Sequence, residues 1–378
     1  MRIVHVGSKG LPAKGGTERV VEAIAVRHAR SHDVTVYGSS RACVTGWFEG
    51  VRVVAVWVPP NKFLAPVWLD VASSLQVLWA GAADVVHVHG SENSFVLPLL
   101  RLRFPVVTTN HGPAYERAKW GRFASALIRS AERGSVVRAD AATAVAKSDA
   151  MSLSQRYGVE VTHIPNGVDE STRPDDEGAR GLLAELGLEP GLFALFAAAR
   201  VDPTKGCLTL IEAWRALGSP TPLLIVGDLW HAPGHEAQLR AAAEGLDVHF
   251  VPRIEDKALV FGLVAAADVF IFPSTVEAMS MMLLEAAALS APVLASDIQA
   301  NTDVLPDRDW LFVPGDSEDL ARAYRSLKAE PTAGVRARCA HRADHVRSNY
   351  SWDRIAEQYA EVYARVARGL IAKGAAAT

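Results

Sequence analysis

The sequence predicts an α/β protein built from two doubly wound sheets that face each other across a cleft. The chain has 378 residues, which is too long for one compact core and suits two domains. Short apolar, β-branched runs alternate with longer stretches of helical period, and this series occurs twice. A polar, turn-rich run at 165–178 separates the two series. Domains are therefore expected at 1–170 and 171–354, with a last helix at about 355–378 packing back on the first.

The first series supplies a complete doubly wound domain. Most of its strands are largely apolar, as expected for parallel strands covered on both faces. Helices are expected at Thr17–Ser31, Pro66–Ala80 and Trp120–Val136. The strands are expected at Arg2–Val6, Asp33–Tyr37, Val51–Val56, Val85–His89, Val106–Asn110, Ala141–Ala144 and Val161–Ile164.

The second series restarts after the turn-rich run and has the same character. Two consecutive βαβ series predict two parallel sheets with helices on both faces. Its strands are expected at Leu192–Ala199, Pro222–Val226, Val248–Val251, Val269–Phe272, Val293–Ser296 and Trp310–Val313, with helices between them.

Bulk properties exclude several classes of protein. A net charge of −3 gives no electrostatic reason to expect nucleic acid binding. Three distant cysteines, at positions 43, 207 and 339, form neither a disulfide framework nor a metal-ligand spacing. The first residues read as a strand entering a glycine turn, and no window reaches the apolar length of a membrane span. A cytoplasmic protein is expected.

Two loops at the ends of predicted strands suit a phosphate ligand. Gly15 and Gly16 lie where the first strand gives way to a helix, so backbone N–H groups can approach an anion there. A tight turn with Thr17 as helix cap explains the same residues. Arg200 ends the first strand of the second series, and Lys205 follows in a loop closed by Gly206. Two converging cations suit a diphosphate, although solvated surface residues are the simpler reading.

Two glutamates frame the stretch Ser-Thr-Val-Glu-Ala-Met-Ser-Met-Met-Leu-Leu-Glu that begins at residue 274. Glu277 is expected in the loop after a strand, and Ser280 is expected to cap a helix beginning at Met281. Glu285 then lies in an apolar helix, where a buried carboxylate needs a polar partner. A helix-cap role for Glu277 remains open.

Histidines close two strands of the first series. His111 lies at a Gly-Pro turn, where it can donate to a hydroxyl, although a lone histidine is more often structural. His87 and His89 alternate on one strand, and no third ligand stands at a recognisable spacing, so no metal site is expected.

Taken together, these motifs resemble glycosyltransferase family 4, whose members have the GT-B fold, over nearly the whole chain. The resemblance rests on Gly-Gly-Thr-Glu (15–18), Ile-Pro-Asn-Gly-Val-Asp (164–169), Arg200 with Lys205, and two glutamates separated by seven residues. Pro-Val-Leu-Ala-Ser-Asp-Ile (292–298) and Tyr-Ser-Trp-Asp-Arg-Ile-Ala (350–356) add to it. The stretch 110–121 looks like the bacterial rhamnosyltransferase-like subgroup that builds surface polysaccharides.

The resemblance implies a retaining, metal-independent glycosyltransferase with no cofactor beyond its nucleoside diphosphate sugar donor. Arg200 and Lys205 would hold and stabilise the departing diphosphate, with Glu277 and His111 completing the catalytic set. Glu285 would accept hydrogen bonds from the ribose. The remaining donor contacts would come from Gly15, Gly16, Asn166, Ala278, Met279, Ser280 and Met281. Family members usually carry Gly after the first glutamate; Ala278 puts a methyl group there, which narrows the pocket or changes donor choice.

The acceptor is expected to be a glycan, a lipid-linked sugar or a secondary metabolite. A nucleotide-sugar epimerase of GT-B architecture, a natural-product glycosyltransferase and a non-catalytic nucleotide-sugar binder are the alternatives. A side hypothesis is weak peripheral contact with anionic lipid through a basic first-domain face, against the simpler reading of a solvated helix. That face would combine Arg101, Arg103, Arg117, Lys119, Arg122 and Arg129 with Phe104, Trp120 and Phe123. The nucleotide base and the oligomeric state stay open.

Overall fold

A computed structural model describes residues 1–61, 64–112, 122–169, 173–229 and 233–375, with side chains omitted at 122–128, 233 and 370–375. The chain forms two compact units. Unit 1 consists of Met1–Gly167 together with Trp352–Thr378, and unit 2 is Val168–Ser351. Each unit is a parallel sheet covered by helices, which confirms the predicted pair of doubly wound sheets.

Unit 1 contains an eight-stranded sheet in the order β3-β4-β2-β1-β5-β6-β7-β8. All neighbouring strands are parallel except β3 and β4, which form an antiparallel hairpin at one edge. The strands are β1 (Arg2–Val6), β2 (Asp33–Ser39), β3 (Gly46–Phe48), β4 (Val51–Val56), β5 (Val85–His89), β6 (Val106–Asn110), β7 (Ala141–Ala144) and β8 (Val161–His163).

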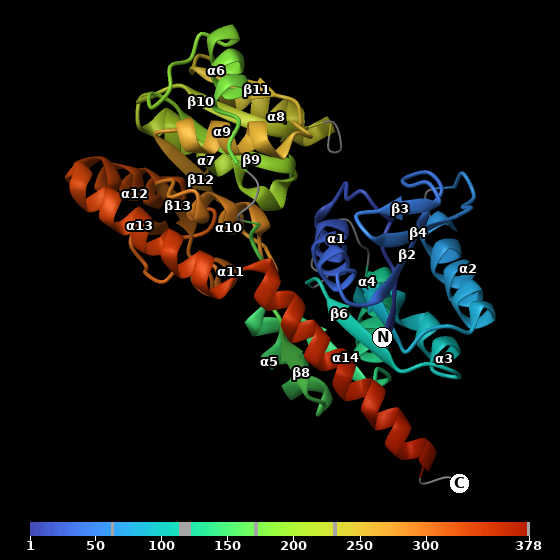
Figure 1. The fold of residues 1–378 in the computed structure, drawn as a ribbon. Coiled ribbons are helices and arrows are strands. Elements are labelled where there is room, and N and C mark those ends of the chain that lie inside the picture. Colours follow the sequence, from blue (N-terminus) through green and yellow to red (C-terminus); the bar gives the residue numbers. More distant parts are fainter. Residues whose placement is uncertain (62–63, 113–121, 170–172, 230–232, 376–378) are drawn as a thin grey trace. The chain divides into compact units, whose positions relative to one another are not determined.

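The helices of unit 1 cover this sheet, and the last helix of the chain is one of them (Figure 1). The helix α14 (Trp352–Ala375) joins unit 1 after the whole of unit 2. Its Ala356 carbonyl lies 2.8 Å from His28 Nε2, and Arg27 Nε donates to Asp353 at 2.6 Å. The other helices are α1 (Gly16–His28), α2 (Leu64–Ala80), α3 (Leu97–Leu100), α4 (Arg122–Val137), α5 (Lys147–Tyr157) and the 3₁₀ turn η1 (Ser91–Val96).

Unit 2 contains a six-stranded, wholly parallel sheet in the order β11-β10-β9-β12-β13-β14. Its strands are β9 (Ala194–Arg200), β10 (Leu223–Asp228), β11 (Val248–Val251), β12 (Val269–Phe272), β13 (Val293–Ser296) and β14 (Leu311–Phe312). Its helices are α6 (Asp176–Glu185), α7 (Cys207–Ala216), α8 (Pro233–Ala243), α9 (Lys257–Ala266), α10 (Met281–Ala288), α11 (Gln299–Thr302), α12 (Ser317–Ala329) and α13 (Thr332–Asn349), with the 3₁₀ turn η3 (Pro203–Lys205).

Two apolar cores lie on the two faces of this sheet. Along β9, Leu195 packs into one core and Phe196 into the other, because successive side chains of a strand point to opposite faces. Both residues are essentially inaccessible to solvent. This burial on both faces explains why the strands read as continuous apolar runs.

Two local features differ from the sequence prediction. The hairpin strand β3 was not predicted; it forms because Glu49 (φ 46°) and Gly50 (φ 83°) adopt the two left-handed conformations of a type I′ turn. The run at 165–178 was predicted to be a turn-rich linker, but α6 already begins at Asp176. Asp175 starts that helix by accepting a hydrogen bond from the Gly178 N–H at 2.9 Å.

Candidate functional site

The loop that follows β9 is held in one conformation by its own residues. Asp202 Oδ1 accepts hydrogen bonds from the N–H of Thr204 at 3.0 Å and from its hydroxyl at 2.5 Å. Gly206 then closes the loop with φ 68°, a conformation that other residues rarely adopt. A β-carbon on Gly206 would lie 2.0 Å from the carbonyl oxygen of Pro273. The loop therefore presses against the chain that leaves the neighbouring strand β12.

Contacts between these two loops bring together two of the residues predicted from sequence. Thr275 donates its backbone N–H to the Thr204 carbonyl at 2.8 Å. Lys205 Nζ lies 2.5 Å from Glu277 Oε1, and the side chains are 24 % and 12 % exposed. Because β9 and β12 are adjacent parallel strands, a half-buried cation and carboxylate stand together at the carboxyl edge of the sheet.

Arg200 occupies the last position of β9, beside Asp228 on β10. It is exposed, and within the described ranges its side chain makes neither a hydrogen bond nor an ion pair. A planar cation in this state can bind an anionic ligand without first breaking a contact within the protein.

The segment from Glu277 to Met281 has the local structure that the sequence predicted. Glu277, Ala278 and Met279 lie in the loop after β12, all partly buried. Ser280 caps α10, because its hydroxyl oxygen accepts a hydrogen bond from the Leu283 N–H at 3.3 Å. The N-terminus of α10, which favours negative charge, therefore follows Glu277 by only a few residues.

The buried carboxylate of Glu285 has an ion-pair partner that the sequence did not reveal. Lys257 Nζ, at the start of α9, lies 2.7 Å from Glu285 Oε1, and the Glu285 side chain is only 4 % exposed. The ammonium group also stands 5.0 Å from the centre of the Phe261 ring. In the sequence, the helix cap Asp256 indicates only that a helix begins at Lys257. Only the packing of α9 against α10 brings the two charges together.

Glu285 also lines a cavity of about 340 Å³ in unit 2. Two arginines, Arg173 and Arg347, line the same cavity, and Arg347 donates to the Ala288 carbonyl at 2.5 Å. The other lining residues are Val168, Asp169, Pro174, Phe261, Ala288 and Leu289. Arg200, Lys205 and Glu277 do not line this cavity. The predicted donor-binding residues of unit 2 therefore fall into two groups: these three at the carboxyl edge of the sheet, and Glu285 at the cavity.

The predicted glycine loop of unit 1 is occupied by carboxylates. Gly15 caps α1 in an extended conformation, and a β-carbon there would lie 2.4 Å from Glu18 Oε2. Glu18 accepts from the Lys9 N–H at 3.3 Å, and Glu22 accepts from the Ala13 N–H at 2.7 Å. These two glutamates therefore order the loop through its backbone N–H groups.

The histidines of unit 1 form a cluster that the sequence did not predict. His5, on β1, is in register with His87 on β5, so the two rings share one face of the sheet with His89. Their ligand atoms lie within 4.8 Å of one another, so the fold brings His5 beside two histidines to which no sequence spacing had related it. Both nitrogens of His87 are engaged, by the hydroxyls of Tyr363 and Thr109 at 2.7 Å each. Hydrogen bonds already occupy both nitrogens of His87, and we assign no metal to the cluster.

Burial keeps this cluster uncharged. Desolvation lowers the pKa of His5 to about 3 and lowers the pKa values of His87 and His89 well below their usual range, with further lowering from neighbouring histidines. His111 follows β6 and joins the cluster through His89, whose Nδ1 lies 3.2 Å from His111 Nε2. Asn166 is also buried.

Part of the predicted basic face lies outside the described residues, namely Arg117, Lys119 and Trp120, and the side chains of Arg122 and Phe123 are not described either. Phe104 was predicted on that face, but it is 5 % exposed, because it packs into the apolar core of unit 1 with Leu100 and Val106. Arg101 pairs with Asp140 at 2.8 Å.

Comparison with known proteins places these features in a family. Residues 14–172 match the profile of Glycosyltransferase Family 4, and residues 193–330 match that of Glycosyl transferases group 1. The chain is 30 % identical over 386 residues to a phosphatidyl-myo-inositol mannosyltransferase of Mycobacterium leprae, with 97 % of each chain covered.

Solved structures share the fold. A sucrose-phosphate synthase from Thermosynechococcus elongatus superposes with a TM-score of 0.79 at 22 % identity, covering 98 % of this chain and 99 % of that one. Anabaena HepE, solved in complex with UDP and glucose, also gives a TM-score of 0.79, at 20 % identity, covering 97 % and 100 %.

Proposed function

This chain belongs to glycosyltransferase family 4, and we propose that it is a retaining enzyme that moves a sugar from a nucleoside diphosphate sugar to an acceptor hydroxyl without a metal. The observation that carries this proposal is the Lys205–Glu277 pair at the carboxyl edge of the unit 2 sheet, with Arg200 exposed on the adjoining strand end. The relatives support the donor class: one is named as a mannosyltransferase, and HepE was also solved with UDP-glucose.

The chemistry we assign to these residues follows from charge. Breaking the glycosidic bond leaves negative charge on the diphosphate, which a point charge and a planar bidentate cation together can stabilise. In the absence of donor, Glu277 holds Lys205 in place at 2.5 Å. When the diphosphate binds, it competes for Lys205 and releases Glu277 to accept hydrogen bonds from sugar hydroxyls. Retention is proposed to occur by attack on the same face, with the departing phosphate oxygen receiving the acceptor proton.

The remaining contacts are proposed by family membership. Glu285 accepts from the ribose hydroxyls, with the ion pair to Lys257 orienting that carboxylate before the donor binds. The backbone N–H groups of Ala278, Met279, Ser280 and Met281 bind the sugar, Gly15, Gly16 and Asn166 bind the remainder of the donor, and His111 contacts the sugar. The methyl group of Ala278 restricts which donor fits.

The test measures transfer and its donor dependence. Thermal-shift screening with UDP, GDP, dTDP and ADP identifies the nucleotide, and the sugar conjugates of the best ligand are then assayed with an acceptor panel of glycans and lipid-linked sugars. We expect a product only when both substrates are present. Conversion of the donor into an isomeric nucleotide sugar without acceptor would instead identify an epimerase, and the absence of any turnover with a tightly bound donor would identify a binding protein.

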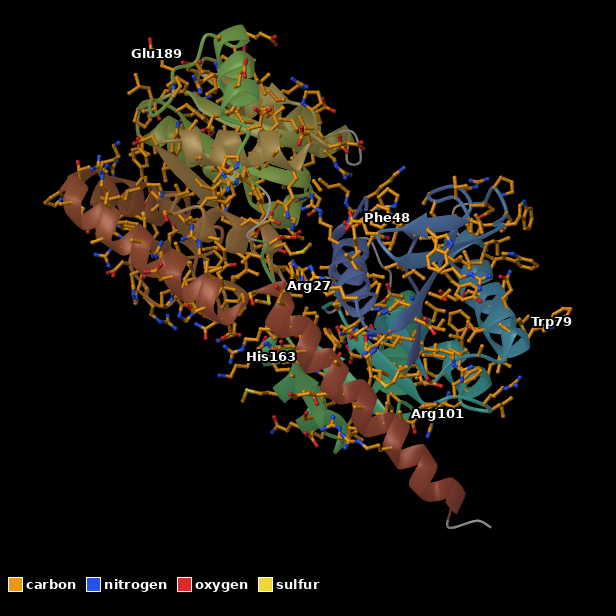
Figure 2. All side chains as sticks on the ribbon, in the orientation of Figure 1. Arg27, Phe48, Trp79, Arg101, His163 and Glu189 are labelled. Carbon is orange, nitrogen blue, oxygen red and sulfur yellow. The ribbon has the colours of Figure 1, made fainter. Side chains whose placement is uncertain are left out.

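We further propose that unit 1 contacts an anionic bilayer surface through α2. None of the described helices is long and apolar enough to cross a bilayer. The α2 helix nevertheless exposes Trp68 (48 %) and Trp79 (90 %), and Figure 2 shows Trp79 projecting from α2 away from the rest of unit 1. Three aliphatic side chains of α2 are also at least half exposed: Leu64, Val67 and Leu75. The one charged residue of α2, Asp70, is buried.

Charge at both ends of α2 favours lipid over a second protein chain. Arg103 donates to the Leu78 carbonyl at 2.9 Å near one end of the helix. Arg41 donates to the Pro60 carbonyl at 3.4 Å before the other end. Tryptophan rings flanked by arginines are typical of segments that lie in the headgroup region, where each basic side chain contributes about 1 kcal/mol on an anionic surface.

Vesicle binding tests this surface. Wild-type protein is mixed with phosphatidylcholine vesicles that contain or lack phosphatidylglycerol, and bound protein is measured by co-sedimentation at low salt. We expect binding only to the anionic vesicles, and at least about tenfold weaker binding of the Trp68→Ser/Trp79→Ser variant. Trp47→Ser, which removes another exposed tryptophan from β3, is the control. Equal vesicle binding by the Trp68→Ser/Trp79→Ser variant and the Trp47→Ser control would contradict the assignment of this face to lipid. So would a stable dimer of the wild-type protein in light scattering.

A further inference from the structure

Three histidine rings in unit 1 form one head-to-tail chain of hydrogen bonds. His111 Nε2 lies 3.2 Å from His89 Nδ1, and His89 Nε2 lies 3.0 Å from His5 Nδ1. The chain runs from the end of β6 across β5 to β1, three residues that are far apart in the sequence. The rings of His5 and His89 stack at 5.3 Å between centres, and those of His89 and His111 at 5.5 Å.

We propose that His5 and His89 are positioning residues that fix which nitrogen of His111 carries its proton. Each contact in the chain joins two imidazole nitrogens, so one must be an N–H group and the other a lone pair. A neutral ring carries one proton. The three rings can therefore carry their protons all on Nδ1 or all on Nε2, and no mixed arrangement satisfies both contacts.

The rings of His5 and His89 are held neutral. The coupling requires this, because a ring that carried two protons could not accept a hydrogen bond. His5 and His89 are fully inaccessible to solvent. Desolvation lowers the pKa values of both, that of His5 to about 3, so neither ring takes up a second proton near neutral pH.

The inner end of the chain selects between the two arrangements. His5 Nε2 is buried, and no group among the described residues lies within hydrogen-bonding distance of it. With all protons on Nε2, this atom would be a buried N–H donor without a protein acceptor, which carries the desolvation penalty of an unsatisfied polar group. With all protons on Nδ1 it is a lone pair, which is better tolerated. His111 is therefore assigned the Nδ1–H form, with its Nε2 accepting from His89.

This assignment gives the buried rings a function at the site. The inference rests on the proposed function only in that His111 contacts the sugar. A histidine restricted to the Nδ1–H form carries its proton on Nδ1, while its Nε2 accepts from His89. Such a ring donates to a sugar hydroxyl without first changing tautomer, which is the kind of preorganisation that favours transfer.

Nitrogen-15 NMR of the histidine rings tests the proposal without any activity measurement. Protein labelled on histidine is examined at about pH 8, above the ordinary histidine pKa of about 6.5. Single His→Gln variants at positions 5, 89 and 111 assign the signals. We expect His5, His89 and His111 all to be Nδ1–H, with the alternative tautomer of His111 populated roughly tenfold less or lower. A mixed set of tautomers, or a predominant Nε2–H form at His111, would overturn the proposal.

A variant tests whether His89 transmits the preference. In His89→Phe, His111 loses its ring partner, and we expect the Nε2–H form of His111 to appear. Tyr363→Phe is the matched control, because it removes a hydroxyl that contacts His87 and leaves the three-ring chain unaltered; its His111 signals should match wild type. An unchanged His111 spectrum in folded His89→Phe would refute transmission. Should His89→Phe fail to fold, the wild-type tautomers still decide the proposal. Absence of transferase activity would refute the proposed function and leave the ring spectra unaffected.

Discussion

Replacing Lys205 by Met tests the leaving-group role most directly. The substitution keeps an unbranched apolar stem and removes the charged Nζ that lies 2.5 Å from Glu277. Two effects follow, one on the transition state and one on the folded state, and their magnitudes differ enough to be separated.

Loss of a charged donor aimed at a developing anion typically lowers kcat by about 10²–10³, or roughly 2.7–4 kcal/mol. The effect on folding is smaller. The two side chains are 24 % and 12 % exposed, so solvent screens the pair in part, and its loss should destabilise unit 2 by about 1–2 kcal/mol. A protein of ordinary stability remains folded after such a loss, which lowers Tm by a few degrees. A large fall in kcat would then report on the site rather than on unfolding.

The assay follows product formation by chromatography at saturating donor, with Tm measured on the same samples. Lys328→Met is the matched control, because Lys328 forms an ion pair with Asp268 at 2.9 Å in the same unit but lies in α12, away from the carboxyl ends of β9 and β12. We expect the control to retain wild-type kcat. Turnover of Lys205→Met within about fivefold of wild type would refute the assignment of Lys205 to the leaving group.

Three further predictions concern stability. Gly206→Ala should lower the free energy of unfolding by about 2 kcal/mol or more in urea titrations, because its β-carbon would meet the carbonyl oxygen of Pro273. Gly218→Ala is the control: Gly218 has a similar φ of 74° but open space around it, so this variant should lose only about 1 kcal/mol. Equal losses in the two variants would exclude the steric explanation. Burial, and secondarily a nearby carboxylate, raises the pKa of Asp70 to about 8, so the folded protein holds a proton that the unfolded chain releases near 3.8. Wild-type stability should therefore fall from pH 3.8 towards pH 8, and the Tm advantage of Asp70→Asn should grow over that window; a constant difference would contradict the shift. Lys257→Met should cost about 1–3 kcal/mol in urea, since Glu285 is 4 % exposed, and a loss below about 0.5 kcal/mol would show that other contacts satisfy this carboxylate.

Much of the unit 2 site was visible in the sequence because its signals are local. The ends of β9 and β12 follow from where apolar runs stop, and Ser280 was predicted as a helix cap from its position before an apolar helical run. Glu277 was placed in a loop for the same reason. Adjacent strands of a parallel sheet end at the same edge, so the meeting of Lys205 with Glu277 followed once the two strands became neighbours.

Contacts that depend on which strands and helices become neighbours were not visible. The partner of Glu285 stands on α9, and no spacing in the chain relates Lys257 to it. His5 lies in the interior of the first strand, where no sequence pattern relates it to another histidine. Only the register of β1 with β5 places it beside His87. The same holds for α2: the sequence predicted a helix there, but only the fold leaves its two tryptophans exposed to solvent.

Local sequence patterns were enough to predict most strands and helices, their division into two parallel sheets, and the loops that carry Arg200, Lys205 and Glu277. These properties depend on periodicity, caps and turn residues, which act over a few neighbouring positions. Only the folded arrangement creates the Lys257–Glu285 pair, the three-histidine chain and the exposed face of α2. Each of these joins or exposes side chains according to strand order and helix packing, and a linear pattern does not encode that order.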